Sequence, residues 1–161
     1  MEDNHKLKII ERFDSYYSGI NNKGTFILAV NTLIISGFLI GVKDLLSFID
    51  EDQLQCFKLL LTITIFISLI SMALTFLAII PFFKTHKDSF WFFNSVANQS
   101  KDLFLEKIDS QDSKDEIRDI NEQIYFLAKG LKSKHIKVKA ALIINLIQLL
   151  FIGCIACTIL I

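Results

Sequence analysis

The sequence has few residues that would interrupt a helix: one proline and six glycines among 161 residues. Three long stretches, residues 24–42, 59–83 and 140–161, contain no charged side chain at all. Even the shortest of them, as a helix, reaches about 28 Å, close to the roughly 30 Å hydrocarbon core of a bilayer. Because three uncharged runs of this length are difficult to bury in so short a chain, we predict an all-α membrane protein with three transmembrane helices.

Acidic residues are missing from the last part of the chain, where five lysines but no Asp or Glu follow Glu122. Residues 84–139 carry eleven Lys or Arg, and residues 1–23 carry four more. Residues 43–58 carry only two, with four acidic residues. Because Lys and Arg in short flanks remain on the cytoplasmic side of a membrane, we predict that residues 1–23 and 84–139 face the cytoplasm.

Catalytic and metal-binding patterns are also lacking. The sequence has no P-loop and no G-x-S-x-G or G-x-G-x-x-G motif. His5, His86 and His135 are far apart. Cys154 and Cys157 form a C-x-x-C inside an apolar run with no nearby His or carboxylate, which favours packing over redox or metal chemistry. We predict neither an enzyme nor a cofactor or metal. The balanced charge, 17 against 17, gives no reason to expect binding to polymeric nucleic acid.

The predicted segments follow from these patterns. Leu7, Ile10, Phe13 and Tyr17 recur every three or four residues, which predicts an amphipathic helix on the membrane surface or against the cytoplasmic region. The word INNKG, 20–24, is typical of a bend before the first span. The expected segments are an N-terminal amphipathic helix (1–23), transmembrane helices (24–42, 59–83, 140–161), a short external loop (43–58) and a cytoplasmic helical sensor region (84–139).

Within the cytoplasmic region we expect a helix over 95–108, a polar turn over 109–115, and then one long helix over about 114–160. Ser113 and Glu116 fit a capping box at its start. Gly130 costs a helix only about 1 kcal/mol, so it does not end this one. A stripe at 3-4-3-4 spacing predicts a packing seam within the chain or between copies, formed by Ile117, Ile120, Ile124, Leu127 and Leu131.

Three amides lie inside the uncharged runs: Asn31, Asn145 and Gln148. An amide in hydrocarbon needs a partner, so we expect these side chains to face other helices. Two interpretations stay open. The amides pack against helices of the same subunit, or they form a hydrated seam between subunits. Ser36, Ser68 and Ser71 supply small surfaces for close helix approach.

Amines, amides and aromatic rings gather at the cytoplasmic end of the spans. Amines and amides suit phosphate, and aromatic faces suit a base. Lipid headgroups fit the same residues as well as an anionic ligand does. The residues are Arg12, Asn21, Asn22, Lys23, Lys84, His86, Lys132, Lys134 and His135, and Trp91 near them suits an interfacial belt equally.

Three motifs resemble one known family. NNKGTFILAVN, 21–31, is similar to its D-x-K-A-[small]-x-x-L-x-x-N pattern at the head of a first span. The family's FF motif and the helix after it are similar to FWFFNSVANQSKDLFLEKI, 90–108. The helix that leads into the family's last span is similar to DINEQIYFLAKGLKSKHIKVKAALI, 119–143. In order and spacing they resemble the Pycsar-type transmembrane effectors of bacterial anti-phage defence.

This resemblance implies that a partner cyclase makes a cyclic nucleotide, and that the effector senses it and compromises the inner membrane, which stops growth before phage mature. Lys23, Asn31, Phe92, Phe93 and Gln123 match the family motifs, whereas Asn21, Gly24, Asn94 and His135 depart from them. With the resemblance added, the predicted ligand-binding set is Arg12, Asn21, Lys23, Phe93, Asn94, Gln123, Tyr125, Lys134 and His135.

Because a single three-helix unit is too thin to enclose a pore, we also expect a homo-oligomer in contact with inner-membrane lipids. Two other function classes remain. A constitutive membrane scaffold or accessory subunit would dock a partner helix on the stripe of residues 117–131. A membrane-bound enzyme would need a convergent acid, base or nucleophile, which the sequence does not provide.

Overall fold

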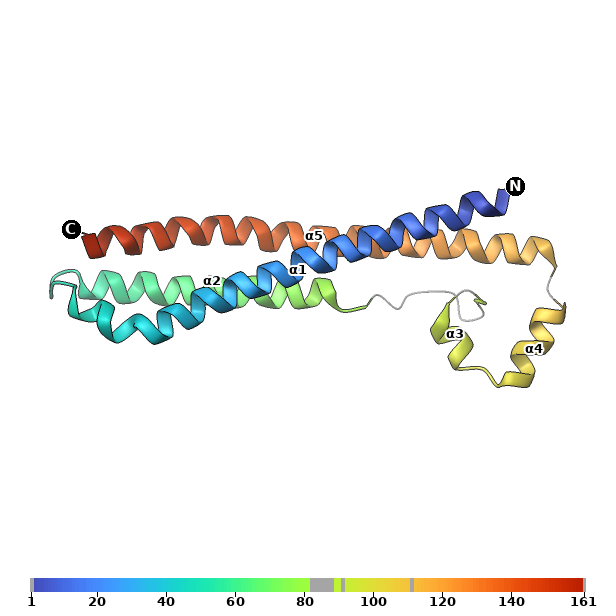
Figure 1. Ribbon diagram of the computed structural model, residues 1–161, viewed down its shortest axis with the longest axis horizontal. Coiled ribbons are helices and arrows are strands. Elements are labelled where there is room, and N and C mark those ends of the chain that lie inside the picture. The colour runs from blue at the N-terminus through green and yellow to red at the C-terminus, as the bar shows by residue number, and fades with distance from the viewer. Residues whose placement is uncertain (1, 82–88, 91, 111, 161) are drawn as a thin grey trace. The chain divides into compact units, whose positions relative to one another are not determined.

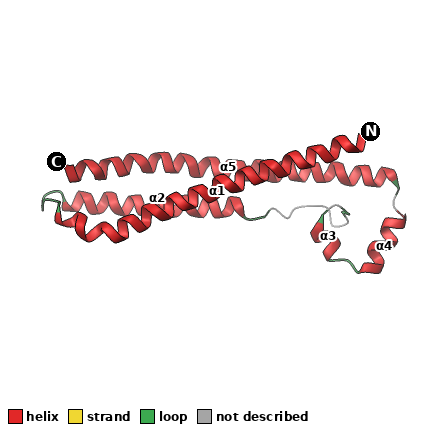
Figure 2. Cartoon of the chain, viewed as in Figure 1, coloured by secondary structure: helices red, strands yellow, loops and turns green. Residues whose placement is uncertain are grey.

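The computed structural model describes residues 2–81, 89–90, 92–110 and 112–160, and every regular element in this part of the chain is an α-helix (Figures 1 and 2). Three helices are long and apolar enough to cross a membrane, which confirms the predicted fold class. In chain order the helices are α1 (Glu2–Ser47), α2 (Leu54–Ile79), α3 (Phe93–Ala97), α4 (Lys101–Ser110) and α5 (Ser113–Leu160).

The long C-terminal helix confirms the prediction of a helix over about 114–160. It runs from Ser113 to Leu160 without interruption, and Gly130 lies inside it. At its start, the Asp112 carbonyl accepts hydrogen bonds from the amides of Asp115 (3.0 Å) and Glu116 (3.2 Å). The side chain of Ser113, on which the predicted capping box depends, lies outside the described part of the structure.

The predicted bend at 20–24 is wrong, because α1 continues as one helix from Glu2 to Ser47. Gly24 is buried, and a Cβ built on it would lie 2.9 Å from Ile79 Cδ1. The missing side chain therefore allows α1 to approach α2 closely. A glycine costs a helix about 1 kcal/mol, and this close packing compensates for that cost.

The predicted helix over 95–108 is two helices, α3 and α4, separated by residues 98–100. Asn98 ends α3, and its Nδ2 donates to the carbonyl of Asn94 at 2.7 Å. Ser100 begins α4, because its Oγ accepts from the Leu103 amide (3.3 Å) and its carbonyl from the Phe104 amide (3.0 Å). Asn and Ser side chains compete with helical hydrogen bonds and favour helix ends.

The chain divides into two compact units, which are described separately below. The polar unit comprises Met1–Gly19 and Pro81–Ser133, and the apolar unit comprises Ile20–Ile80 and Lys134–Ile161. Helices α1 and α5 contribute residues to both units. The apolar unit contains the three uncharged runs, apart from residues 81–83.

Candidate functional site

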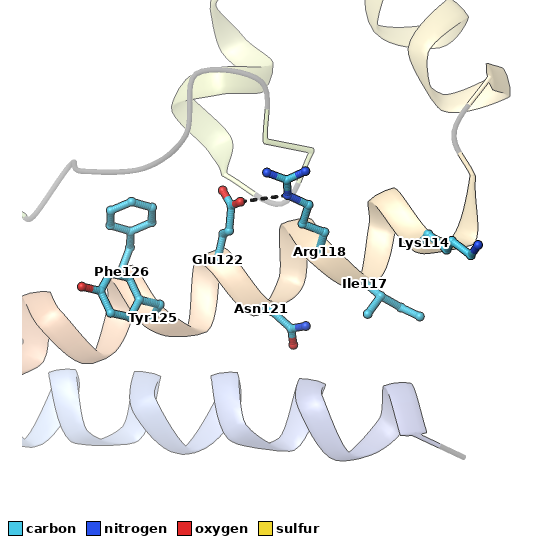
Figure 3. Close-up of a pocket in the computed structure, with 7 residues that line it drawn as sticks. All are labelled: Lys114, Ile117, Arg118, Asn121, Glu122, Tyr125 and Phe126. Carbon is cyan, nitrogen blue, oxygen red and sulfur yellow. Dashed lines mark hydrogen bonds and ion pairs between the residues drawn. The ribbon is translucent and has the colours of Figure 1, made fainter.

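One face of α5 in the polar unit carries an open concavity of about 580 Å³ (Figure 3). Its lining residues recur every three or four positions, so they share one face of the helix. They combine two cationic side chains, an amide, a carboxylate, two aromatic rings and one aliphatic side chain. The residues are Lys114, Ile117, Arg118, Asn121, Glu122, Tyr125 and Phe126. We call this set the α5 surface.

The charged and aromatic groups of the α5 surface are accessible. Arg118 Nε lies 3.3 Å from Glu122 Oε1, and 79% of the Arg118 side chain is exposed. Tyr125 is 60% exposed, and Lys129 Nζ lies 5.9 Å from the centre of its ring. A guanidinium binds phosphate through paired hydrogen bonds, and an exposed ring stacks on a base. The α5 surface therefore has the chemistry to bind a small anionic ligand that carries an aromatic base.

A second face of α5 holds residues 89–90 in place. The Phe90 amide donates to Asp119 Oδ2 at 2.7 Å, and Gln123 Nε2 donates to Ser89 Oγ at 2.7 Å. Asp119 and Gln123 are four residues apart, so they lie on the same face of the helix. The Phe90 ring also lies 6.4 Å from that of Phe104, which connects α4 to the same cluster.

Helix α1 is attached to α5 within the polar unit by a hydrogen bond from Tyr17 Oη to the Leu127 carbonyl at 2.9 Å. Burial raises the pKa of the Tyr17 hydroxyl, and the negative charge of Asp14 adds to this effect. The hydroxyl therefore stays protonated at neutral pH and remains a donor to α5.

Asp119→Ala is expected to loosen the attachment of residues 89–90 to α5. A hydrogen bond to a charged group contributes about 1.5–3 kcal/mol, and its loss leaves the Phe90 amide without this acceptor. Hydrogen exchange followed by mass spectrometry should show faster exchange in the peptide containing Phe90. Asp115→Ala, at an exposed position on the same helix, is the control, and equal exchange in both variants would contradict the expectation.

The structure places five residues of the predicted ligand-binding set in the polar unit, and only Tyr125 belongs to the α5 surface. Arg12 is exposed, and its Nε donates to Tyr16 Oη at 2.8 Å. Asn94 accepts from Asn98 through both of its oxygens. Gln123 is buried against Ser89. The side chain of Phe93 lies outside the described residues.

The other four members belong to the apolar unit: Asn21, Lys23, Lys134 and His135. Lys23 and His135 are exposed, and Asn21 is partly buried. Lys134 is only 5% exposed, and its Nζ donates to the carbonyls of Ala78 (2.7 Å) and Ile79 (2.9 Å) at the C-terminal end of α2. Lys134 therefore caps α2. Lys84, His86 and Trp91, which the sequence also indicated, lie outside the described residues.

The apolar stripe on α5 is largely covered within the chain. Ile120 is 2% exposed, and Ile124, Leu127 and Leu131 are partly buried. Ile117, at 37%, is the most exposed residue of the stripe. This packing uses most of the surface that a partner helix would need, so it disfavours the scaffold interpretation.

Each of the three amides of the uncharged runs forms a hydrogen bond to another helix inside the apolar unit. Asn31 Nδ2 on α1 donates to Asn145 Oδ1 on α5 at 3.0 Å and lies 3.5 Å from Ser71 Oγ on α2. Gln148 Nε2 on α5 donates to Ser68 Oγ on α2 at 2.5 Å. Asn31 and Gln148 are almost completely buried. Side chains of all three helices thus meet through polar groups within the predicted hydrocarbon region.

Helix α2 contributes a stripe of four hydroxyls to this contact. Thr64, Ser68, Ser71 and Thr75 are each 0% exposed and are spaced by four, three and four residues. Ser68 and Ser71 were predicted only as small packing surfaces, and Thr64 and Thr75 were missed. Their helical spacing inside an uncharged run was the available signal. We call the set the polar seam: Asn31, Thr64, Ser68, Ser71, Thr75, Asn145 and Gln148.

Comparisons with known proteins agree with the resemblance drawn from the three motifs. A family model described as the Pycsar effector protein domain matches residues 5–161, almost the whole chain. A search of curated proteins and a search of solved structures each find no significant match.

Proposed function

This chain belongs to the Pycsar effector family, and from that premise we propose that it permeabilises the bacterial inner membrane when a cyclic nucleotide binds. Effectors of this family act in anti-phage defence through cyclic-nucleotide signalling. The observation that carries the proposal is the match over residues 5–161, which includes all three apolar helices. Loss of the membrane potential would stop growth before phage mature, as in abortive infection.

We place the N-terminus and the polar unit in the cytoplasm, where a partner cyclase would release its product. Residues 1–23 and 84–139 carry 15 of the 17 Lys and Arg residues, whereas the 43–58 segment carries only two, with four acidic residues. Retention of Lys and Arg on the cytoplasmic side supports this orientation. The segment between α1 and α2 would then face outward.

Within the polar unit we propose the α5 surface as the binding site. Arg118 and Lys114 would bind the phosphate, and the exposed ring of Tyr125 would stack on the base. The carboxylate of Glu122, now 3.3 Å from Arg118, would give up that contact to the ligand. Lys134 is excluded from the proposed site because its Nζ caps α2.

Helix α5 provides a physical connection from this site to the apolar unit, because it is one helix from Ser113 to Leu160. A ligand that changes the packing of the α5 surface would change the same helix that carries Asn145 and Gln148. To move a resting population from 1:99 to 99:1, the ligand must prefer the active state by about 5.5 kcal/mol. A few charge-assisted hydrogen bonds at about 1.5–3 kcal/mol each are sufficient.

The proposal is tested with the full-length chain reconstituted in vesicles that report membrane potential, to which 3′,5′-cyclic mononucleotides are added one at a time. We expect at least one nucleotide to cause depolarisation. Arg118→Gln with Tyr125→Ala should weaken the response about tenfold or more, because a base stack alone contributes about 1–3 kcal/mol. Lys101→Gln, an exposed change on α4, should leave it unchanged.

Two results would contradict the proposal. Depolarisation that is equal with and without every nucleotide would exclude ligand gating. A stoichiometric second protein that co-purifies with the chain, with no depolarisation under any condition, would instead favour an accessory subunit.

A further inference from the structure

We propose that the polar seam is the surface that water and small monovalent cations contact when the membrane is permeabilised. This inference rests on the proposed function and deepens it, because it assigns the residues of the conducting route and the charge of the permeating species. Its basis is the apolar unit alone.

The first observation is that the apolar unit turns polar side chains inward. Six of the seven seam residues are at most 1% exposed, and Asn145 is partly buried. The outward faces carry large apolar side chains instead, such as Phe26, Leu33 and Leu150, each about 70% exposed. From Thr64 to Thr75 the α2 stripe covers about 17 Å along the helix axis, so it follows more than half of the hydrocarbon core.

The second observation is that the packed seam leaves acceptors unsatisfied. Asn31 Oδ1 and Gln148 Oε1 are buried and have no hydrogen-bond partner among the described residues. Their amide nitrogens, in contrast, donate to Asn145 Oδ1 and Ser68 Oγ. A buried polar atom without a partner destabilises the dry state relative to a hydrated one. Separation of the helices would let water donate to both oxygens.

The hydroxyls of α2 are also available mainly as hydrogen-bond acceptors. Thr64, Ser68 and Thr75 donate to the carbonyls of Leu60, Thr64 and Ser71, four residues earlier in their own helix. A hydroxyl that donates to its own helix keeps lone pairs with which it accepts. In a hydrated seam these three hydroxyls would therefore act mainly as acceptors.

The third observation locates a weak side of the bundle. A groove of about 310 Å³ lies between α1 and α5, lined by apolar side chains that include Phe26, Val30 and Leu146. Asn145 and Gln148, two members of the seam, also line it. The seam is thus reached from the side where α1 and α5 leave space between them, and separation along this groove breaks no contact across the groove itself.

The chemistry of the seam selects the permeating species. Small hard cations are coordinated by carbonyl, amide and hydroxyl oxygens, as in the filters of cation channels. The seam contains no charged side chain, so a cation would be stabilised without being held tightly. Anions need donors, and the hydroxyls of Thr64, Ser68 and Thr75 donate within α2 itself, so separation of the helices does not free them.

The test uses the full-length chain in planar bilayers with a KCl gradient and 3′,5′-cyclic mononucleotides. The wild-type reversal potential should move toward that of K⁺. Asn31→Leu with Gln148→Leu removes the two unsatisfied oxygens and should lower the nucleotide-induced conductance about tenfold or more, the effect of a barrier raised by about 1.4 kcal/mol. Leu33→Ile, on an exposed face of α1, is the matched control.

A second set of variants is independent of the stability of the double mutant. In a chain whose three cysteines are replaced by serine, Ser71→Cys should react with a cationic thiol reagent from water once a nucleotide has induced conductance, and the reaction should block the current. Ile70→Cys, the adjacent position at 53% exposure, should not block it.

The outcomes separate the two proposals. Conductance in the wild type that is equal in the double variant, or a chloride-selective current, would overturn the seam and leave permeabilisation intact. A wild-type chain whose melting temperature rises with a nucleotide but which conducts nothing would overturn the proposed function, and the seam with it. A stable double variant, with lost conductance and an unchanged nucleotide-induced melting shift, would support both.

Discussion

Gly24→Leu is expected to lower the melting temperature of the detergent-solubilised protein by about 2–12 °C. A Cβ at this position would lie 2.9 Å from Ile79 Cδ1, 3.0 Å from Ile79 Cγ1 and 3.3 Å from Thr75 Cγ2. A leucine adds three more carbon atoms and would force α1 away from α2. Overpacking of this kind costs about 1–3 kcal/mol, and each kcal/mol corresponds to about 2–4 °C for a chain of this size.

The same helix offers a matched control, because a Cβ at Gly37 would have no heavy atom within 4 Å. Gly37→Leu introduces the identical side chain into α1 and should change the melting temperature little. Gly24→Ala should fall between the two, since Ile79 can adjust its flexible end. Equal melting temperatures for Gly24→Leu and Gly37→Leu would show that the close approach of α1 and α2 at Gly24 is unimportant for stability.

Lys134→Met is expected to cause the other large loss of stability. The lysine donates from a nearly buried position to the carbonyls of Ala78 and Ile79. Those carbonyls belong to the last turn of α2, which has no continuing helix to satisfy them. Methionine keeps the apolar stem but removes the donor. We expect a loss of about 3 kcal/mol, or about 6–12 °C in the melting temperature.

Lys132→Met is the control for this variant, because Lys132 is exposed on the same helix two residues earlier. It removes the same charge without uncovering the end of α2. A second measurement is nucleotide binding to Lys134→Met at a temperature where the variant is folded. Unchanged binding is expected if Lys134 acts only as a cap, whereas loss of binding would return Lys134 to the ligand site.

The elements that depend on long uniform patterns were predictable from the sequence. The three apolar helices follow from uncharged runs of 19 residues or more. The continuity of α5 follows from its apolar repeat and from the small cost of a glycine within a helix. Both signals sum over many residues, so a single unfavourable residue does not reverse them.

The wrong predictions depended on short polar words. INNKG looked like a bend, but Gly24 leaves room for Ile79 and Thr75, more than fifty residues away, and the helix continues through it. Asn98 and Ser100 interrupt the predicted 95–108 helix, because their side chains hydrogen-bond to nearby backbone. Whether a helix continues or ends at such a short polar segment depends on contacts with residues distant in the sequence, which a local pattern does not contain.

The candidate sites show the same limit. Of the α5 surface that we propose as the binding site, the sequence indicated Tyr125 but not Lys114, Arg118 or Asn121, since charged helix faces are ordinarily solvated surface. Lys134 was assigned to the ligand because a lysine near a membrane usually faces phosphate or water. Its actual acceptors are carbonyls 55 and 56 residues away along the chain, which no local spacing reveals.

The hydroxyl stripe has a consequence for how the protein enters the bilayer. Thr62, Thr64, Ser68 and Thr75 donate to carbonyls of α2 itself, so α2 can leave the translocon as a solitary helix with these groups already satisfied. The hydrogen-bond acceptor of Gln148 is Ser68 on α2. This bond would hold α5 near α2 during biogenesis. Insertion and docking would then be separate stages, with the amide of α5 as the contact that recruits it.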